Sequence, residues 1–198
     1  HNKDPTPLQQ ASHGAYLLDL IRNEDCTTIA RLLEAGISPN PANRHGDSVV
    51  HMVCRRGLTR VLHTFVAGGA SVQIADRYGR TPLHDACWVS NNWGIIRLLL
   101  ESDVRLVSMT DGRGATPLSY IHRDDWGGWH EFLQDNLDKY WPKRKVLRDG
   151  EQGVPELAEL PANGRPLADP EKALSPELAE MVVSGRMEPD EAQFLTHN

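Results

Sequence analysis

The sequence is poor in cysteine and has no long apolar run. Only Cys26, Cys54 and Cys87 occur among 198 residues, and an odd, widely spaced set does not form the disulfide framework of a small secreted domain. No run approaches the roughly 18 consecutive apolar residues of a membrane span. We therefore expect an intracellular protein, cytoplasmic or nuclear. The sequence begins at His1, which leaves open a removed targeting segment and hence an organelle.

The sequence also lacks the short motifs of common enzymes. It has no G-x-S-x-G nucleophile motif, no P-loop, and no G-x-G-x-x-G between a strand and a helix. We therefore expect no enzymatic activity and no cofactor. An enzyme stays only as a minor alternative.

Charge is distributed unevenly along the chain, whose net charge is −6. Residues 149–198 carry 11 acidic and 3 basic side chains, whereas residues 43–89 carry 6 arginines and 3 acidic side chains. This asymmetry indicates a basic surface in the first half and an acidic tail.

Several residue types recur at a constant interval. Five pairs of positions are separated by 33 residues: Gly36 and Gly69, Asn43 and Asp76, Gly46 and Gly79, His51 and His84, and Cys54 and Cys87. Such a period is typical of repeat proteins, in which each repeat is one supersecondary unit.

The clearest unit begins at Asp76 and ends with an apolar helical run at Ile95 to Leu100. Gly79 suits a tight turn with positive φ, Thr81 can cap a helix, and Pro82 suits its first position. The segment Thr81-Pro82-Leu83-His84-Asp85-Ala86 is the T-P-L-H-x-A pattern of the ankyrin repeat, which the chain resembles over about residues 12–141.

The resemblance implies an all-α ankyrin-repeat solenoid of about four helix-turn-helix repeats with an extended, partly helical C-terminal tail. After an N-terminal extension, 1–11, the repeats are expected at about 12–42, 43–75, 76–110 and 111–141. The fourth repeat carries Thr116-Pro117-Leu118-Ser119 and then aromatic residues that either seal the end of the stack or dock the tail or a partner: Trp126, Trp129, Phe132, Tyr140 and Trp141.

The tail, 142–198, is acidic and punctuated by prolines. Residues 154–167 are expected to be extended, and a short helix is expected near 175–184, ending at Gly185. A segment of this kind has too few apolar residues for a core of its own. We expect it to become ordered on its own repeats or on a partner.

The pairs His51/Cys54 and His84/Cys87 raise a metal-binding hypothesis, because residues three apart share a helix face. Zinc sites use tighter paired spacing, and buried cysteine commonly packs as a small hydrophobe. The resemblance also implies that each histidine makes structural hydrogen bonds. We therefore expect packing and no metal.

The resemblance further implies a partner-binding face made by loop tips and by the outward positions of first helices. We call the matching positions the basic–aromatic face: Arg44, His45, Asp47, Arg55, Arg56, Arg77, Tyr78, Arg80, Trp88, Val89, Arg113 and Arg123. Arginine and aromatic residues often dominate interface energies, and arginine pairs with carboxylates. We expect an acidic segment of another protein, or the chain's own tail, as ligand.

The predicted function is therefore a non-catalytic protein–protein interaction module, either a scaffold or adaptor or a fixed subunit of a larger complex. Besides the enzyme, three alternatives stay open. The face is merely solvated, or the chain is a regulatory protein associated with nucleic acid, or it binds metal. The basic run Pro142-Lys143-Arg144-Lys145-Val146 favours nucleic acid or a nuclear-localisation signal, while the overall acidity opposes a nucleic-acid footprint.

Overall fold

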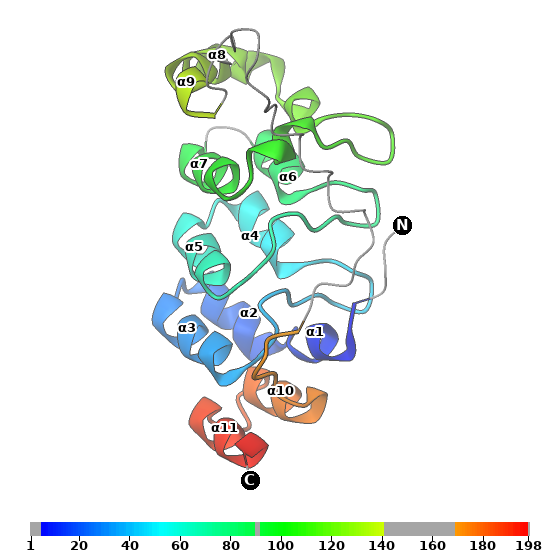
Figure 1. Cartoon of the computed structure of the whole chain (residues 1–198), viewed down its shortest axis with the longest axis vertical. Helices are drawn as coiled ribbons and strands as arrows, with labels where there is room; N and C mark the ends of the chain where they lie inside the picture. Colours follow the sequence, from blue (N-terminus) through cyan, green and yellow to red (C-terminus); the bar gives the residue numbers. More distant parts are fainter. Residues whose placement is uncertain (1–4, 90–91, 141–168, 198) are drawn as a thin grey trace, which may run out of the picture.

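The computed structural model describes residues 5–89, 92–140 and 169–197, and the helices stack along one axis (Figure 1). Within these residues the secondary structure is helical and no strand forms; Ala42 and Ser48 make an isolated bridge. The all-α prediction is confirmed.

Three pairs of α-helices form the body of the stack. They are α2 (Ala15–Arg22) with α3 (Cys26–Ala35), α4 (Val49–Arg56) with α5 (Thr59–Ala67), and α6 (Pro82–Val89) with α7 (Trp93–Ser102). Helix α5 packs between α3 and α7, and α4 packs against α6. Fully buried side chains such as Ile29, Phe65 and Leu99 join neighbouring pairs into one core, which is how a repeat that cannot bury its apolar face alone is stabilised.

Three loops between the repeats have the same hydrogen-bonding pattern. The first residues of these loops are Asn43, Asp76 and Asp111. The backbone N–H of each donates to the carbonyl four residues later, and its carbonyl accepts the N–H three residues later. Its side-chain oxygen accepts the N–H groups two and four residues later. The turn glycines Gly46, Gly79 and Gly114 have φ of 79°, 79° and 80°. The 33-residue period therefore marks equivalent parts of a repeated structure.

Two buried histidines, His51 and His84, each form a hydrogen bond with the loop that follows their repeat. The Nε2 atom of His51 lies 2.8 Å from the carbonyl oxygen of Arg80, and that of His84 lies 3.1 Å from the carbonyl oxygen of Ala115. Cys54 and Cys87 are buried in the same helices, and burial raises the pKa of both thiols. The H-x-x-C pairs thus lie in the packed interior.

The fourth unit departs from the expected helix-turn-helix. Its Thr-Pro-Leu-Ser segment forms only a 3-10 turn, η2 (Pro117–Tyr120), which is preceded by η1 (Val104–Ser108) and followed by η3 (Arg123–Asp125). Ser119 replaces the histidine of the earlier repeats, and its hydroxyl lies 3.2 Å from that of Thr116. A short serine side chain supplies no imidazole bridge, so the equivalent inter-repeat tie is missing from this unit.

The last helices of the stack are α8 (Trp126–Asp135) and α9 (Leu137–Tyr140). Trp129, Phe132 and Tyr140 are buried, and Trp93 of α7 stacks on Phe132 with ring centroids 4.9 Å apart. These contacts support the sealing role, whereas Trp126 is exposed. Trp141 lies outside the described residues.

The N-terminal extension contains a helix that the sequence analysis did not predict. Helix α1 (Pro7–Ala11) begins with a capping box, in which Thr6 and Gln9 exchange side-chain-to-backbone hydrogen bonds. Such reciprocal bonds satisfy two of the free N–H groups at a helix start. Leu8 of α1 is buried in the core.

The described part of the tail returns to the first repeat. Helices α10 (Pro176–Val183) and α11 (Pro189–His197) lie at the α1–α3 end of the stack, opposite α8 and α9 (Figure 1). Helix α10 packs on α1 and α2, and α11 packs on α3. Leu174, Val182 and Val183 are buried there.

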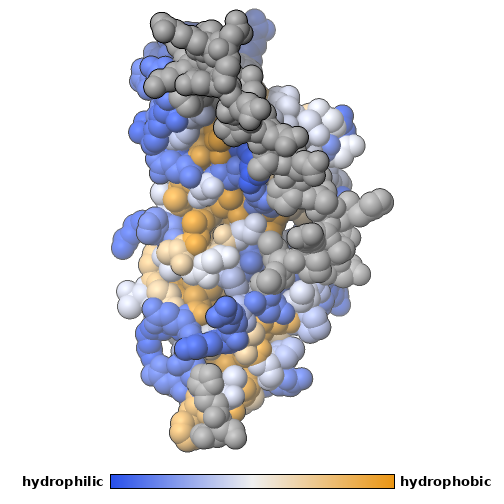
Figure 2. Space-filling model, in the orientation of Figure 1, coloured by the Kyte–Doolittle hydropathy of each residue, from blue (hydrophilic) through white to orange (hydrophobic). Residues whose placement is uncertain are grey.

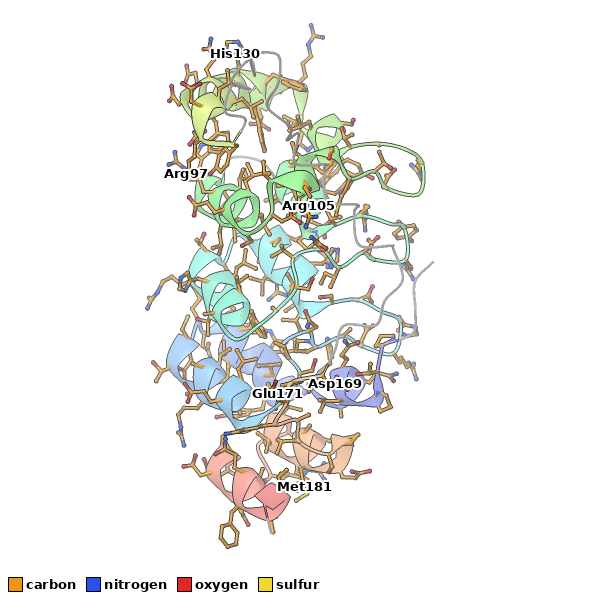
Figure 3. All side chains as sticks on the ribbon, in the orientation of Figure 1. Arg97, Arg105, His130, Asp169, Glu171 and Met181 are labelled. Atoms are coloured by element: carbon orange, nitrogen blue, oxygen red, sulfur yellow. The ribbon has the colours of Figure 1, made fainter. Side chains whose placement is uncertain are left out.

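Polar contacts fix the position of the returning segment. The backbone N–H of Leu174 donates to the carbonyl oxygen of Gly36 at 2.9 Å, and Gln193 donates to that of Glu34 at 2.8 Å. Asp169 lies beside α1 (Figure 3), where it accepts a hydrogen bond from Thr6. The C-terminal helix pair thus closes the end of the stack that the first repeat would otherwise leave open. The expected extended stretch 154–167 and the basic run 142–146 lie outside the described residues.

Candidate functional site

The basic–aromatic face is mostly exposed. Tyr78 and Trp88 keep 54% and 55% of their surface accessible, and of the twelve predicted residues only Arg80 is half-buried.

The outer edge made by α3, α5 and α7 (left in Figure 2) carries many hydrophilic residues, with apolar residues visible along the stack beside it.

Two aspartates next to this face, Asp76 and Asp85, are neutralised by its arginines, whereas Asp47 of the face itself is exposed and forms no ion pair among the described residues. The guanidinium of Arg80 donates twice to Asp76, at 2.8 and 2.6 Å. Arg55 donates to Asp85 at 2.8 Å, and Arg80 lies 4.0 Å from the same carboxylate. Since the side chains of Asp76 and Asp85 are only 9% and 4% exposed, little of their own negative charge reaches the surface.

Asp76 illustrates the balance of forces. Burial alone would raise the pKa of Asp76, but hydrogen bonds from the Arg80 guanidinium and from the backbone N–H groups of Arg80 and Tyr78 lower it below its ordinary value. The guanidinium of Arg80 is therefore engaged inside the chain, where it stabilises the loop. We expected Arg80 among the partner-binding residues, because the direction of a loop side chain cannot be read from a periodic pattern.

Other arginines of the face have no carboxylate partner. Among the described residues, no ion pair within 4.0 Å involves the following: Arg44, Arg56, Arg77, Arg113 and Arg123. All five are exposed. The face consequently presents positive charge that no carboxylate of the described residues neutralises.

Tyr78 brings two successive loops together. The guanidinium carbons of Arg77 and Arg80 lie 4.9 and 5.1 Å from the centroid of its ring, at cation–π distance. Its carbonyl oxygen accepts the backbone N–H of Gly112 at 2.8 Å. The loop with Arg77 and the loop with Arg113 are thereby held side by side.

Trp88 and Val89 at the end of α6 lie beside His122, which follows η2. We call these three residues the aromatic shelf. The rings of Trp88 and His122 are 4.7 Å apart, and the ring of Tyr120 meets Trp88 edge-on at 6.4 Å. All three shelf residues are exposed. A ligand side chain could therefore reach the open part of the indole without rearrangement of the chain.

Tyr120 connects the aromatic shelf to the basic loops. Its hydroxyl donates to Asp111 at 2.6 Å, and this bond is the largest cause that lowers the pKa of Asp111 to about 2. The other oxygen of Asp111 accepts the N–H groups of Arg113 and Ala115. Sequence reasoning missed Tyr120 and His122; their position just after the Thr-Pro-Leu-Ser segment was the available signal.

The described residues contain no group of three or more His, Cys, Asp or Glu side chains placed to hold a metal ion. None of the helices in the described part of the chain is long and apolar enough to cross a membrane.

Helix pairs stacked through a shared core, with hairpin-like loops between them, define a helical repeat protein. A family model described as ankyrin repeats (3 copies) matches residues 17–121. Since this range is more than half of the chain, the chain belongs to the ankyrin-repeat family, as the T-P-L-H-x-A pattern predicted.

Individual relatives match part of the chain. The chain is 36% identical over 89 residues to potassium channel KOR2 of Oryza sativa subsp. japonica, which covers 45% of the chain and 12% of the channel. It is 30% identical over 119 residues to an ankyrin repeat protein of Rickettsia bellii, covering 46% of the chain and 50% of that protein. The chain thus spans at most half the length of either relative.

Proposed function

We propose that the chain is a non-catalytic protein-interaction module that binds an acidic segment of another protein on its basic–aromatic face. Ankyrin repeats suggest protein–protein interaction. The observation that supports the choice of face is its charge: Asp76 and Asp85 are buried and paired, while Arg77 and Arg113 are exposed and form no ion pair with any residue that the structure describes. A carboxylate-rich partner would meet a surface that needs little internal rearrangement.

The module acts either as a scaffold or adaptor that exchanges partners, or as a fixed accessory subunit of a larger complex. The described part of the tail supports neither form over the other, because α10 and α11 pack on the chain's own first repeat. It does bear on the self-ligand hypothesis: residues 169–197 contact α1 to α3, so these residues do not fill the basic–aromatic face.

Site-specific photo-cross-linking tests the proposal. A photoreactive amino acid replaces Tyr78 on the face, and in a matched control it replaces His63, which is exposed on α5. We expect adducts with a partner protein at position 78 but not at 63, and fewer adducts when Arg113→Ala is added. Equal labelling at the two positions would count against this face.

The two forms of the function differ in partner exchange. A fixed subunit should copurify with its partner at constant stoichiometry through a wash at high salt. An adaptor should lose its partner in that wash, because screening weakens contacts between exposed charges.

A further inference from the structure

The aromatic shelf and the exposed loop arginines Arg77 and Arg113 lie on one connected surface. Trp88 contacts Tyr120, Tyr120 donates to Asp111, and Asp111 holds the loop that carries Arg113. The carbonyl of Tyr78 then joins this loop to the one with Arg77. An apolar subsite and a basic subsite are therefore fixed relative to each other by hydrogen bonds and ring contacts.

The shelf is too small to be the apolar core of an interface between two folded domains. Such interfaces bury about 800 Å² on each partner, whereas the shelf consists of three side chains. A shelf of this size fits a single bulky side chain. The open part of the Trp88 indole, 55% exposed, is suited to it because tryptophan in a partly enclosed site is a frequent binding hot spot.

The electrostatics of the surface determine what accompanies that side chain. Arg77 and Arg113 are exposed without a carboxylate partner among the described residues, and the nearby carboxylates of Asp76 and Asp85 are already paired. Positive charge thus lies on the loop side of the shelf. A ligand that covers both subsites places its acidic groups toward the loops.

We infer that the face binds a linear segment with one bulky apolar side chain, seated on the aromatic shelf, and carboxylates on one side of it, paired with Arg77 and Arg113. This inference rests on the proposed function and makes it specific, because it fixes two subsites and their order. Tyr120 is a positioning residue that keeps the two subsites in register. Single-stranded nucleic acid would use the same rings for stacking and the same arginines for phosphates, so it is the competing outcome.

Selection from a library tests the inference without a known partner. The full chain is immobilised and exposed to displayed random peptides of about 12 residues, long enough to span up to about 40 Å when extended. Parallel selections use Trp88→Ala and the double variant Arg77→Ala with Arg113→Ala. These side chains are exposed, so all three proteins should unfold at similar urea concentrations.

We expect the unmodified chain to select peptides with one bulky apolar position and Asp or Glu grouped on one side. Trp88→Ala should lose the apolar preference and keep the acidic one, and the double arginine variant should do the reverse. Tyr120→Phe should blur the spacing between the two preferences, which a purely structural role of the hydroxyl would not do.

Affinities of the selected peptides give the magnitudes. Trp88→Ala should weaken binding by about 30-fold, as expected for a hot-spot tryptophan. The double arginine variant should weaken it by about 10-fold, and that factor should shrink at high salt.

The remaining outcomes separate the inference from the proposed function. Acidic enrichment without an apolar position, unchanged by Trp88→Ala, would overturn the two-subsite inference and leave the proposed function standing. No enrichment over bare resin, or identical enrichment by all three proteins, would count against both. Binding of random single-stranded RNA that Trp88→Ala abolishes would overturn the peptide in favour of nucleic acid.

Discussion

Replacing Gly36 by alanine should detach the C-terminal helix pair, and replacing Gly69 provides the matched control. Both glycines follow the second helix of their repeat, 33 residues apart, with φ of 105° and 93°. A Cβ at Gly36 would lie 2.1 Å from the carbonyl oxygen of Lys172, whereas one at Gly69 would have only Pro39 nearby, at 4.0 Å. The two substitutions share the strain of positive φ and differ in the clash with the tail.

The expected magnitudes follow from these contacts. Holding alanine in the left-handed region costs about 1–2 kcal/mol at either position. At Gly36 the clash also breaks the backbone bond from Leu174, about 0.5–1.5 kcal/mol, and exposes the buried Leu174 side chain, about 1.5–3 kcal/mol. We therefore expect the free energy of unfolding to fall by about 3–6.5 kcal/mol for Gly36→Ala and by about 1–2 kcal/mol for Gly69→Ala.

Two measurements check this difference. Urea unfolding monitored by circular dichroism gives the two losses, and hydrogen exchange reports on α10 and α11 directly. In Gly36→Ala the amides of both helices should exchange faster, while in Gly69→Ala they should stay protected. Equal losses of stability, or unchanged protection in Gly36→Ala, would refute the tail-docking argument.

Three further predictions concern the repeats themselves. Leu99→Ala should lower the free energy of unfolding by about 2–5 kcal/mol in urea denaturation, because it leaves a cavity in the shared core. Arg80→Ala should lower it by about 1–3 kcal/mol, because the buried carboxylate of Asp76 loses its partner, while Arg77→Ala should change it by less than about 0.5 kcal/mol. Burial lowers the pKa of His51 and His84. Near pH 6.5 these imidazoles are therefore protonated more in the unfolded chain than in the folded chain. The free energy of unfolding should therefore decrease as the pH is lowered from 7 to 5.5, by at most about 1.4 kcal/mol per pH unit for each histidine. The decrease should be less steep in a His51→Gln variant.

The repeat core was predictable from the sequence because its signals are local. Gly46 and Gly79 must take positive φ, and the histidine after Thr-Pro-Leu must reach the next loop, so a fixed interval encodes a fixed contact. The shortened fourth unit was less predictable. Its segment Thr116-Pro117-Leu118 keeps the pattern, but Ser119 follows where the third repeat has a histidine, so the imidazole is missing.

Long-range contacts could not be predicted in the same way. Apolar spacing indicated a helix near 175–184, but nothing in that spacing identifies Gly36 as the residue whose carbonyl accepts the Leu174 amide. Likewise, Arg77 and Arg80 are close in sequence and chemically identical, yet only Arg80 turns toward Asp76. Such choices depend on side-chain direction and on which surfaces meet after folding.

The helices that close the first end of the stack lie apart from the proposed binding face on α6 and its loops. In a repeat protein each unit contacts only its neighbours, so among the described elements detachment of α10 and α11 acts first on α1 to α3 and reaches α6 through α4 and α5. Gly36→Ala should therefore leave the affinity for a selected peptide unchanged within about twofold at low urea, where the later repeats stay folded. Titration of the peptide into both proteins measures this. A larger loss of affinity would mean that the tail and the Trp88 shelf are coupled, and that the C-terminal helices belong to the binding mechanism.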